Sequence, residues 1–288
     1  MPTNEPVRQH WVPRVYLRSF CARPTEREQI YAYDLDSGST FFPSIEKVAV
    51  KRHFYTLAAG TEDRSYAIEN AFTQIESDVS SILSDIRTAE ELPSDPGAIS
   101  ILVKFIATLH MRTRQGLQMI HGYREEVRAG TDSPHSKVQG PFREELLKLD
   151  EEGMRELFAK SAVIVGERIA EHLKRMHWRL LRTNDSYFIT SENPVVSYHR
   201  SEVRWGIGTP GAQTLFPLSP SLLLNLSNEP IIPGQGTCDM TTRAVRGLNG
   251  LTLLAAEQFV FSHCPFDNMS DLLHECRLGN GRTFGPAR

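Results

Sequence analysis

Two groups of strand-like segments flank a central block of long amphipathic helices, and this order limits the folds open to the chain. In the middle of the chain, apolar residues recur at spacings of three and four, the pattern of a helix with one buried face. They are Ile68, Phe72, Ile75, Val79, Ile82 and Ile86. A second helix is expected to start at Asp95-Pro96, an N-cap followed by proline, and to continue to Leu117. A third long helix is predicted from Met154 to His177.

Short segments of β character precede and follow this block. The turn Asp36-Ser37-Gly38-Ser39 separates residues 29–35 from residues 40–42, which predicts a hairpin. Further along the chain, extended segments are expected at 53–57, 178–182, 187–190, 222–226 and 259–262, and a helix at 241–256. The segments 178–182 and 187–190 are interpreted as two strands around an Asn184-Asp185 turn. The order predicts an α+β fold, with the N- and C-terminal strand groups forming one sheet and long helices in the central block.

We expect residues 1–278 to form a single α+β domain. Within it, residues 9–62 would hold a short helix and the hairpin, 65–178 the helical block, and 178–265 the strand-rich part. The glycine-containing tail, residues 279–288, is predicted to be disordered.

The composition is that of an ordinary globular protein, and it excludes several classes. Of the 288 residues, 40% are hydrophobic and 23% are charged, and the net charge is -3. No overall field would therefore draw the chain to nucleic acid or to an anionic membrane, although a local basic patch could. The four cysteines lie far apart and lack metal-type spacing. Because the start does not resemble a signal peptide and the most apolar helix is short, we expect a cytoplasmic protein with no membrane partner.

The opening segment, residues 9–20, carries the first candidate site. Its aromatic side chains must be tied down, since they would otherwise expose a large apolar patch. Pro13 is expected at the first position of a short helix, with Arg14 and Arg18 together on one face and His10 just before it. Two like charges four residues apart are unfavourable, and a carboxylate or a bound anion between them would explain them. Alternatively, the arginines are solvated or salt-bridged and His10 caps the helix.

The second candidate is the turn Ser191-Glu192-Asn193-Pro194, which follows the apolar segment 187–190. A carboxylate and an amide at the end of a core strand could project into a cleft, where they could bind a metal, orient a water or read a base edge. The alternative is an ordinary turn, because Asn-Pro is a strong turn signal.

The third candidate lies on the first two long helices. Glu69 and Glu76 flank the apolar stripe of the first helix, while His110, Arg112 and Arg114 lie on the second, with His110 and Arg114 one turn apart. If the two helices pack antiparallel, these groups could meet in a semi-buried polar network. Such a network could be a structural salt-bridge cluster, or it could form a wall of the pocket that holds His10.

Several of these motifs resemble the bacterial DUF4238 family, a domain of unknown function whose opening reads His-His-x-Val-Pro-x-x-Tyr-Leu-x-x-Phe. The resemblance extends from about residue 9 to 262. The matching residues are His10, Val12, Pro13, Tyr16, Leu17, Arg18, Phe20, Phe54-Tyr55-Thr56, Glu69, Glu76, Arg112, Arg114, Thr190-Ser191-Glu192-Asn193-Pro194-Val195, Pro217-Leu218-Ser219-Pro220 and Asn249. The resemblance implies that these separated polar motifs belong to one site, but it does not name a function.

The chain departs from the family pattern at two positions. Gln9 stands where the family has its first histidine, which would weaken a proton shuttle or metal site built on both histidines. Glu192 replaces aspartate and moves the carboxylate by one methylene, a displacement that catalysis often does not tolerate.

Two functional hypotheses follow. The first is an enzyme that hydrolyses a phosphate-bearing substrate, nucleic acid or nucleotide, with a divalent cation such as Mg²⁺ as a candidate cofactor. The candidate catalytic residues are His10, Arg18, Glu192 and Asn193, and the candidate substrate-binding residues are Arg14, Glu76, Arg112 and Arg114. The second hypothesis is a non-enzymatic ligand- or partner-binding module whose His/Arg/Glu network is structural. A catalytic site requires His10, Arg18 and Glu192 to converge on one open cleft, whereas a structural network pairs these groups with one another.

Overall fold

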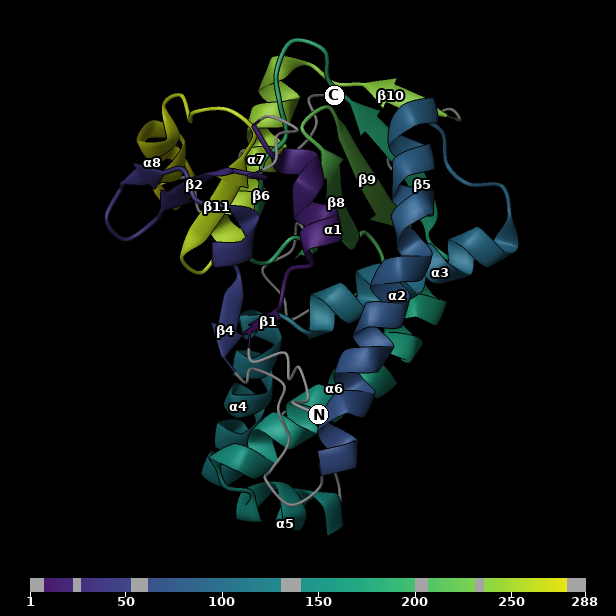
Figure 1. Ribbon diagram of the computed structural model, residues 1–288, viewed down its shortest axis with the longest axis vertical. Coiled ribbons are helices and arrows are strands. Elements are labelled where there is room, and N and C mark those ends of the chain that lie inside the picture. Colours follow the sequence, from purple (N-terminus) through teal and green to yellow (C-terminus); the bar gives the residue numbers. More distant parts are fainter. Residues whose placement is uncertain are drawn as a thin grey trace.

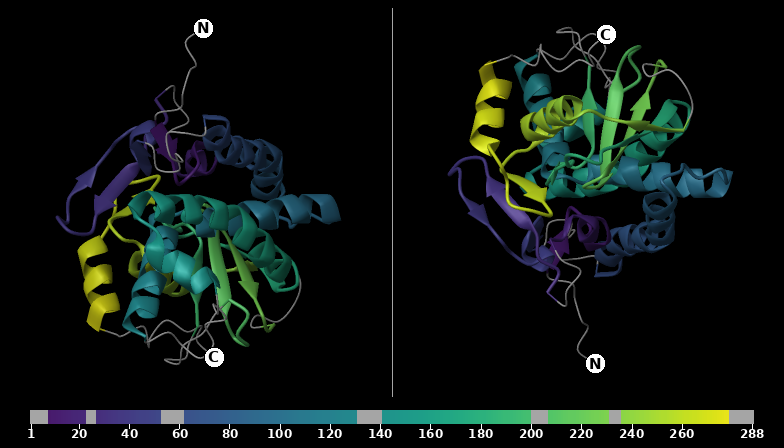
Figure 2. Two further views of the ribbon diagram at one scale, coloured as in Figure 1. Left: turned by 90° about the horizontal axis from the view of Figure 1, so that it is seen from below. Right: turned by 90° about the horizontal axis from the view of Figure 1, so that it is seen from above.

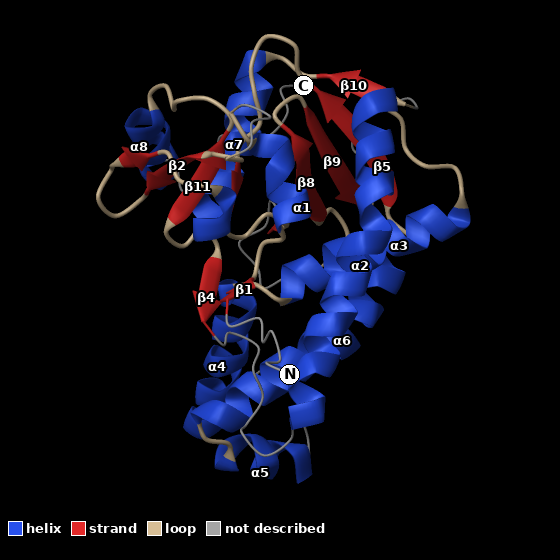
Figure 3. Cartoon of the chain, viewed as in Figure 1, coloured by secondary structure: helices blue, strands red, loops and turns tan. Residues whose placement is uncertain are grey.

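The computed structural model describes residues 8–22, 27–52, 62–130, 141–199, 207–230 and 236–278. Most helices of the central block lie in the lower part of the molecule and the two larger β-sheets in the upper part, while the helix of residues 62–89 rises from the lower part to lie beside one sheet (Figure 1). Figure 3 shows the same division, with most strands gathered on one side of the helical block. The architecture is α+β, as the sequence predicts.

Five helices form the central block. They are α2 (Glu62–Ala89), α3 (Pro96–Met111), α4 (Arg114–Ala129), α5 (Pro141–Lys148) and α6 (Glu151–Leu173). Helix α3 packs against both α2 and α6, and it is the most apolar of the three. Asp95 caps α3 as predicted, because its side chain accepts a hydrogen bond from the Ala98 N–H, with Pro96 in the first turn.

A four-stranded sheet joins strands from the two ends of the chain, so the predicted shared sheet holds for these strands only, because the other C-terminal strands form a second sheet. Its strands are β2 (Tyr31–Asp34), β3 (Thr40–Phe41), β6 (Thr190–Ser191) and β11 (Phe259–Ser262), in the order β3-β2-β11-β6. The expected hairpin is β2–β3, and β11 pairs antiparallel with β2. Figure 2 shows the N-terminal hairpin beside the C-terminal elements.

A second, five-stranded sheet is formed by the last third of the chain. Its order is β10-β5-β9-β8-β7, from β5 (His177–Arg182), β7 (Val196–Tyr198), β8 (Gln213–Ser219), β9 (Leu222–Ser227) and β10 (Thr237–Asp239). A short antiparallel ribbon pairs β1 (Arg8–His10) with β4 (Val50–Arg52). The remaining helices are α1 (Arg14–Leu17) with its 3₁₀ extension η1 (Arg18–Phe20), the 3₁₀ turn η2 (Ile45–Lys47), α7 (Thr242–Ala255) and α8 (Met269–Leu278).

The predicted second helix is wrong beyond Met111. The chain leaves helical geometry at Arg112, and the Thr113 side chain caps a new helix, α4, by accepting a hydrogen bond from the Gly116 N–H. A Cβ atom at Gly116 would clash with the Met111 carbonyl oxygen, so the tight restart requires glycine there. Leu117 therefore belongs to α4, and His110 and Arg114 lie on two different helices.

Two further helix boundaries and one strand pairing differ from the predictions. Pro13 is the N-cap residue of α1 rather than its first residue. Helix α6 ends at Leu173, and His177 already begins β5. The predicted hairpin around Asn184-Asp185 is also wrong, because β5 and β6 belong to different sheets. The predicted extended segment 53–57 and the tail 279–288 lie outside the described residues.

The segment 187–189 is not part of a sheet because a side chain takes its backbone hydrogen bonds. The Asn249 amide on α7 accepts from the Ile189 N–H (3.1 Å) and donates to the Tyr187 carbonyl (2.8 Å). The Phe188 N–H donates to the Pro220 carbonyl at 2.7 Å. These bonds satisfy the buried backbone groups without a neighbouring strand.

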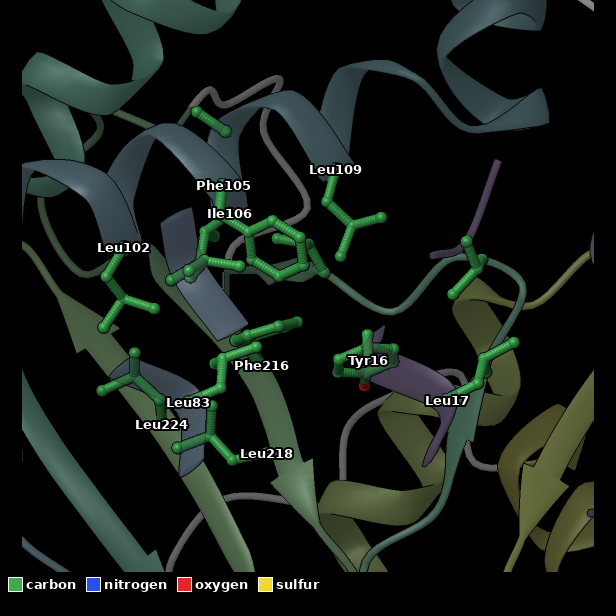
Figure 4. Packing of buried hydrophobic residues seen from close by; sticks show 14 of the residues in the cluster. Tyr16, Leu17, Leu83, Leu102, Phe105, Ile106, Leu109, Phe216, Leu218 and Leu224 are labelled. Carbon is green, nitrogen blue, oxygen red and sulfur yellow. The ribbon is translucent and has the colours of Figure 1, made fainter. Parts of the chain in front are cut away.

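The N-terminal segment is tied down in the centre of the core, as its aromatic content requires. Tyr16 is fully buried and its ring stacks on Phe216 of β8, with the centroids 5.1 Å apart. The ring of Phe105 on α3 also contacts the Phe216 ring, with the two ring centroids 6.2 Å apart (Figure 4). The Tyr16 hydroxyl forms a 2.7 Å hydrogen bond with the Thr190 hydroxyl, which joins the segment to β6. Burial raises the pKa of Tyr16 far above its usual range, so the phenol stays protonated.

Tyr16→Phe should lower the free energy of unfolding by about 1–2 kcal/mol, because it leaves the buried Thr190 hydroxyl without this partner. Thr190→Val in the same background should recover part of that loss. Chemical denaturation of the wild type, both single variants and the double variant measures the coupling. Additive effects of the two substitutions would contradict a direct Tyr16–Thr190 bond.

Candidate functional site

His10 lies at the end of β1, opposite Val50 of β4, with its side chain partly buried. Burial lowers the pKa of His10, and the positive charge of Arg14 lowers it further. A hydrogen bond with the Val48 backbone and the charge of Glu76 act in the opposite direction without reversing the shift. His10 is therefore neutral at neutral pH, and its buried Nδ1 atom has no hydrogen-bond partner among the described residues.

The carboxylate of Glu28 lies between Arg14 and Arg18. A carboxylate in this position is one of the two explanations given above for this pair of like charges. Glu28 Oε1 lies 2.6 Å from Arg18 Nε, and Glu28 Oε2 lies 3.3 Å from an Arg14 terminal nitrogen. Glu46 approaches the same Arg14 nitrogen at 3.1 Å. Burial alone would raise the pKa of Glu28, but the hydrogen bonds and charges of Arg18 and Arg14 hold it below its usual value.

Arg112 links the N-terminal segment to helix α2 from inside the protein. Its side chain is only 3% exposed, and its Nε donates to the Trp11 carbonyl at 3.1 Å. A terminal nitrogen of Arg112 lies 2.8 Å from Glu76 Oε1, and the guanidinium carbon lies 5.1 Å from the centroid of the Phe72 ring. The predicted meeting of Glu76 and Arg112 between helices is thus observed.

Arg114 continues this network toward the turn after β6. Its Nε lies 3.7 Å from Glu257 Oε2, and its guanidinium lies over the Trp11 ring. Glu257 is followed by Gln258 and Phe259, which contact the Glu192 carboxylate. Burial raises the pKa of Glu257, and the charge of Arg114 only partly opposes this shift.

The Glu192 carboxylate is bound to backbone amides rather than presented to a cleft. Its Oε1 accepts hydrogen bonds from the N–H groups of Gln258 and Phe259, the latter at 3.1 Å, and the residue is 1% exposed. Burial raises the pKa of Glu192 despite these two bonds, and the neighbouring charge of Glu257 raises it further. Asn193 is equally buried, and its amide donates to the Ala255 carbonyl at 2.8 Å. This turn therefore fastens the α7–β11 connection.

The residues predicted from sequence fall into two groups. His10, Glu76, Arg112, Arg114 and Glu192 form a network from the N-terminal segment to β11. Neighbouring members act on each other through a contact or a charge, except that Arg112 and Arg114 are linked through Trp11, which both contact. Arg14 and Arg18 lie at the surface beside this network, and Asn193 lies in the interior. The side chain of Glu69 and the segment Phe54-Tyr55-Thr56 lie outside the described residues.

An open groove of about 700 Å³ runs between the α1–η1 segment and the middle of α2. Three of the predicted residues line it, namely Arg14, Arg18 and Glu76. The rest of its lining is Val15 and a set of residues with hydroxyl side chains, namely Thr73, Ser77, Ser80, Ser81 and Ser84. Glu192 and Asn193 are not among the lining residues.

Sequence reasoning missed two carboxylates that shape the site. Glu28 binds both arginines of the opening segment, and Glu257 couples Arg114 to Glu192. The need for a counter-charge beside Arg14 and Arg18 indicates that a partner such as Glu28 exists, but not which acidic residue supplies it. Glu257 lies two residues before the start of the predicted strand 259–262, a position from which a carboxylate can reach a neighbouring strand end.

The described ranges hold neither a candidate metal cluster nor a candidate membrane-spanning helix. No group of three or more histidine, cysteine, aspartate or glutamate side chains in these ranges could hold a metal ion. Within the same ranges, no helix has both the length and the apolar character that crossing a bilayer requires.

The fold and the site define an α+β protein with a buried Arg/Glu network beside a hydroxyl-lined groove. The family model "Protein of unknown function (DUF4238)" matches residues 8–265. The chain therefore belongs to the DUF4238 family, as its motifs indicate. Neither the curated proteins nor the solved structures contain a match to it.

Two substitutions at Glu192 should separate the contribution of its hydrogen bonds to stability from the contribution of its charge. Glu192→Ala removes the acceptor of two buried N–H groups and should destabilise the protein by about 2–4 kcal/mol. Glu192→Gln keeps one acceptor oxygen and removes a carboxylate whose pKa is raised in the folded state. A raised carboxylate pKa means that stability falls as the pH rises through it, so the stability of Glu192→Gln relative to wild type should increase with pH.

Thermal unfolding of the wild type and both variants across acidic to mildly alkaline pH measures this difference. An advantage of Glu192→Gln that shrinks as the pH rises would contradict the assigned direction of the pKa shift.

Proposed function

We propose that the protein is a binding module that holds a phosphate-bearing ligand in the groove between α1–η1 and α2. The observation that carries this proposal is the lining of the groove, two arginines facing a series of hydroxyl groups. The arginine guanidinium matches phosphate oxygens with paired charged donors, and serine and threonine hydroxyl groups can also donate to them.

The arginines retain donors for such a ligand. The described contact of Arg18 with Glu28 uses Nε, and the Arg18 side chain is 52% exposed. Its two terminal amino groups can therefore meet a phosphate without breaking that ion pair. Arg14 pairs through one terminal nitrogen with Glu28 and Glu46, which holds its guanidinium in place at the edge of the groove.

The hydroxyl groups of α2 follow the helical repeat. Thr73, Ser77, Ser80 and Ser84 are spaced by three and four residues, so they lie along one face of the helix. Glu76 is the acidic side chain in the same lining, and Arg112 pairs with it from the interior. The groove therefore offers donors along its length while its one lining carboxylate is charge-compensated.

The buried network supports a structural role for the other predicted residues. Glu192 and Asn193 use their side chains to bind backbone groups of residues 255–259, and Arg112 binds the Trp11 carbonyl. Groups that are desolvated and already paired cannot take up a substrate without breaking these contacts, which is costly for a buried charge. This arrangement favours the binding module over a catalytic role for Glu192.

Phosphate-ester hydrolysis is the second candidate function, and His10 favours it. Its lowered pKa keeps the imidazole neutral at neutral pH, the form that accepts a proton from water. His10 is not itself a lining residue of the groove, but Arg14 and Glu76, whose charges act on it, both line the groove. In this reaction water attacks phosphorus, the ester P–O bond breaks, His10 takes one proton from the attacking water, and the leaving alkoxide takes a proton from solvent, to which His10 later releases its own.

Arg18→Gln should weaken the binding of tripolyphosphate about tenfold or more, because it removes a charge-assisted donor from the groove. Arg246→Gln is the matched control, since Arg246 also pairs with a glutamate, Glu275, but lies on α7. Isothermal titration of each folded protein with tripolyphosphate measures the dissociation constants. Equal affinity of the wild type and Arg18→Gln, or an equal loss in Arg246→Gln, would contradict the proposed groove.

The second candidate predicts cleavage of labelled RNA, DNA or nucleotides by the wild type and not by His10→Gln. Reactions with Mg²⁺, with Mn²⁺ and with a chelator test whether a divalent cation takes part. Because burial lowers the pKa of His10, the rate should fall only at a pH below the ordinary histidine pKa. Equal turnover by His10→Gln would rule out His10 as the base.

A further inference from the structure

A second hollow lies on the other side of Arg14, against the β2–β3 hairpin. It has a volume of about 660 Å³, and its lining joins aromatic and cationic side chains. The aromatic residues are Phe41 and Phe42, and the cations are Arg14, Arg27 and Lys47. Glu28 and Glu46 also line it, so cations outnumber carboxylates by three to two.

Phe41 and Phe42 expose apolar rings at the edge of the four-stranded sheet. Phe41 is 41% exposed and Phe42 is 38% exposed, and β3 is the edge strand. Each ring is nevertheless held from behind. Phe42 packs on Tyr31, with the centroids 4.4 Å apart, and Phe41 meets Phe259 edge-on at 5.6 Å. These contacts fix the rings while part of each ring remains open to solvent.

Arg14 belongs to both hollows, so the aromatic surface and the hydroxyl-lined groove meet at one guanidinium. We propose that the two hollows together bind a single-stranded nucleic acid, with a base stacked on Phe41 or Phe42 and the phosphates following Arg14 and Arg18 along α2. This inference rests on the proposed phosphate groove and names the class of its ligand.

The chemistry of the two surfaces favours this class of ligand. A base offers a flat π face to a fixed aromatic ring, and successive phosphates match the arginine and hydroxyl donors. In a duplex the base faces are covered by stacking, so only a single strand presents both features to these surfaces. The overall charge of -3 means that binding depends on this local set of cations and should weaken strongly with salt.

The test uses the full-length chain and three fluorescent probes: a mixed-sequence single-stranded oligonucleotide, an abasic sugar–phosphate strand of the same length, and a mononucleotide. Anisotropy titrations give the affinity for each. The oligonucleotide should bind at least about tenfold more tightly than the abasic strand, since stacking on an aromatic ring contributes on this scale. It should also bind more tightly than the mononucleotide, which occupies one hollow only.

At least one of Phe41→Ala and Phe42→Ala should reduce oligonucleotide affinity and leave abasic-strand affinity unchanged. At the ring that stacks the base, a Phe→Leu substitution keeps an apolar side chain and should also lose stacking affinity, whereas Phe→Tyr should retain it. Ile164→Ala is the control, because Ile164 is an exposed apolar residue on α6, at 60% exposure, away from the hollow.

The outcomes distinguish the two proposals. Equal binding of the oligonucleotide and the abasic strand, with both weakened by Arg18→Gln, would overturn the base-stacking inference and leave the phosphate groove standing. Preferential binding of the mononucleotide would overturn the single-strand assignment. Failure of the wild type to bind tripolyphosphate and every nucleic-acid probe would overturn both.

Discussion

Burial of the N-terminal segment, residues 9–20, is the constraint on which the rest of the structure depends. Tyr16 stacks on Phe216 of the five-stranded sheet and hydrogen-bonds to Thr190 of the four-stranded sheet, while the Trp11 carbonyl accepts from Arg112 beside the helical block. One short segment thus joins both sheets to the helices. Because its apolar side faces the core, its arginines are left on the surface next to α2. The groove is a direct consequence of how this segment is buried.

The charged side chains around this segment fall into a buried group and an exposed group. Arg112 is buried and paired with Glu76, and it holds the start of the chain against α2. Glu192 and Glu257 are desolvated, and burial raises the pKa of both carboxyls, so they contribute less to stability at higher pH. At the surface, Arg14 and Arg18 share Glu28 in high dielectric, where such pairs contribute little to stability. The buried charges therefore hold segments together, whereas the exposed ion pairs add little to stability.

Local patterns in the sequence were sufficient for many elements. The stripe Phe72–Ile86, the Asp95 cap and the strand 259–262 follow rules of spacing and capping, and all three are observed. The break at Arg112 was not predictable from periodicity, because it depends on Thr113 capping a new helix and on Gly116 fitting against the Met111 carbonyl. Likewise, the apolar segment 187–189 has strand character, but Asn249 takes its backbone bonds from a helix about sixty residues away. For the candidate site, the residue types indicated which charged groups interact. They did not indicate that Glu192 is buried, because its burial is set by tertiary packing.

The most direct test of the phosphate groove is hydrogen–deuterium exchange of the full-length protein with and without saturating tripolyphosphate. Ligand bound between α1–η1 and α2 should slow amide exchange in residues 13–20 and 73–84. It should leave strands β5 and β9, which do not line the groove, unchanged. Absence of protection in both segments, or protection confined to other elements, would contradict the assignment of this groove as the ligand site.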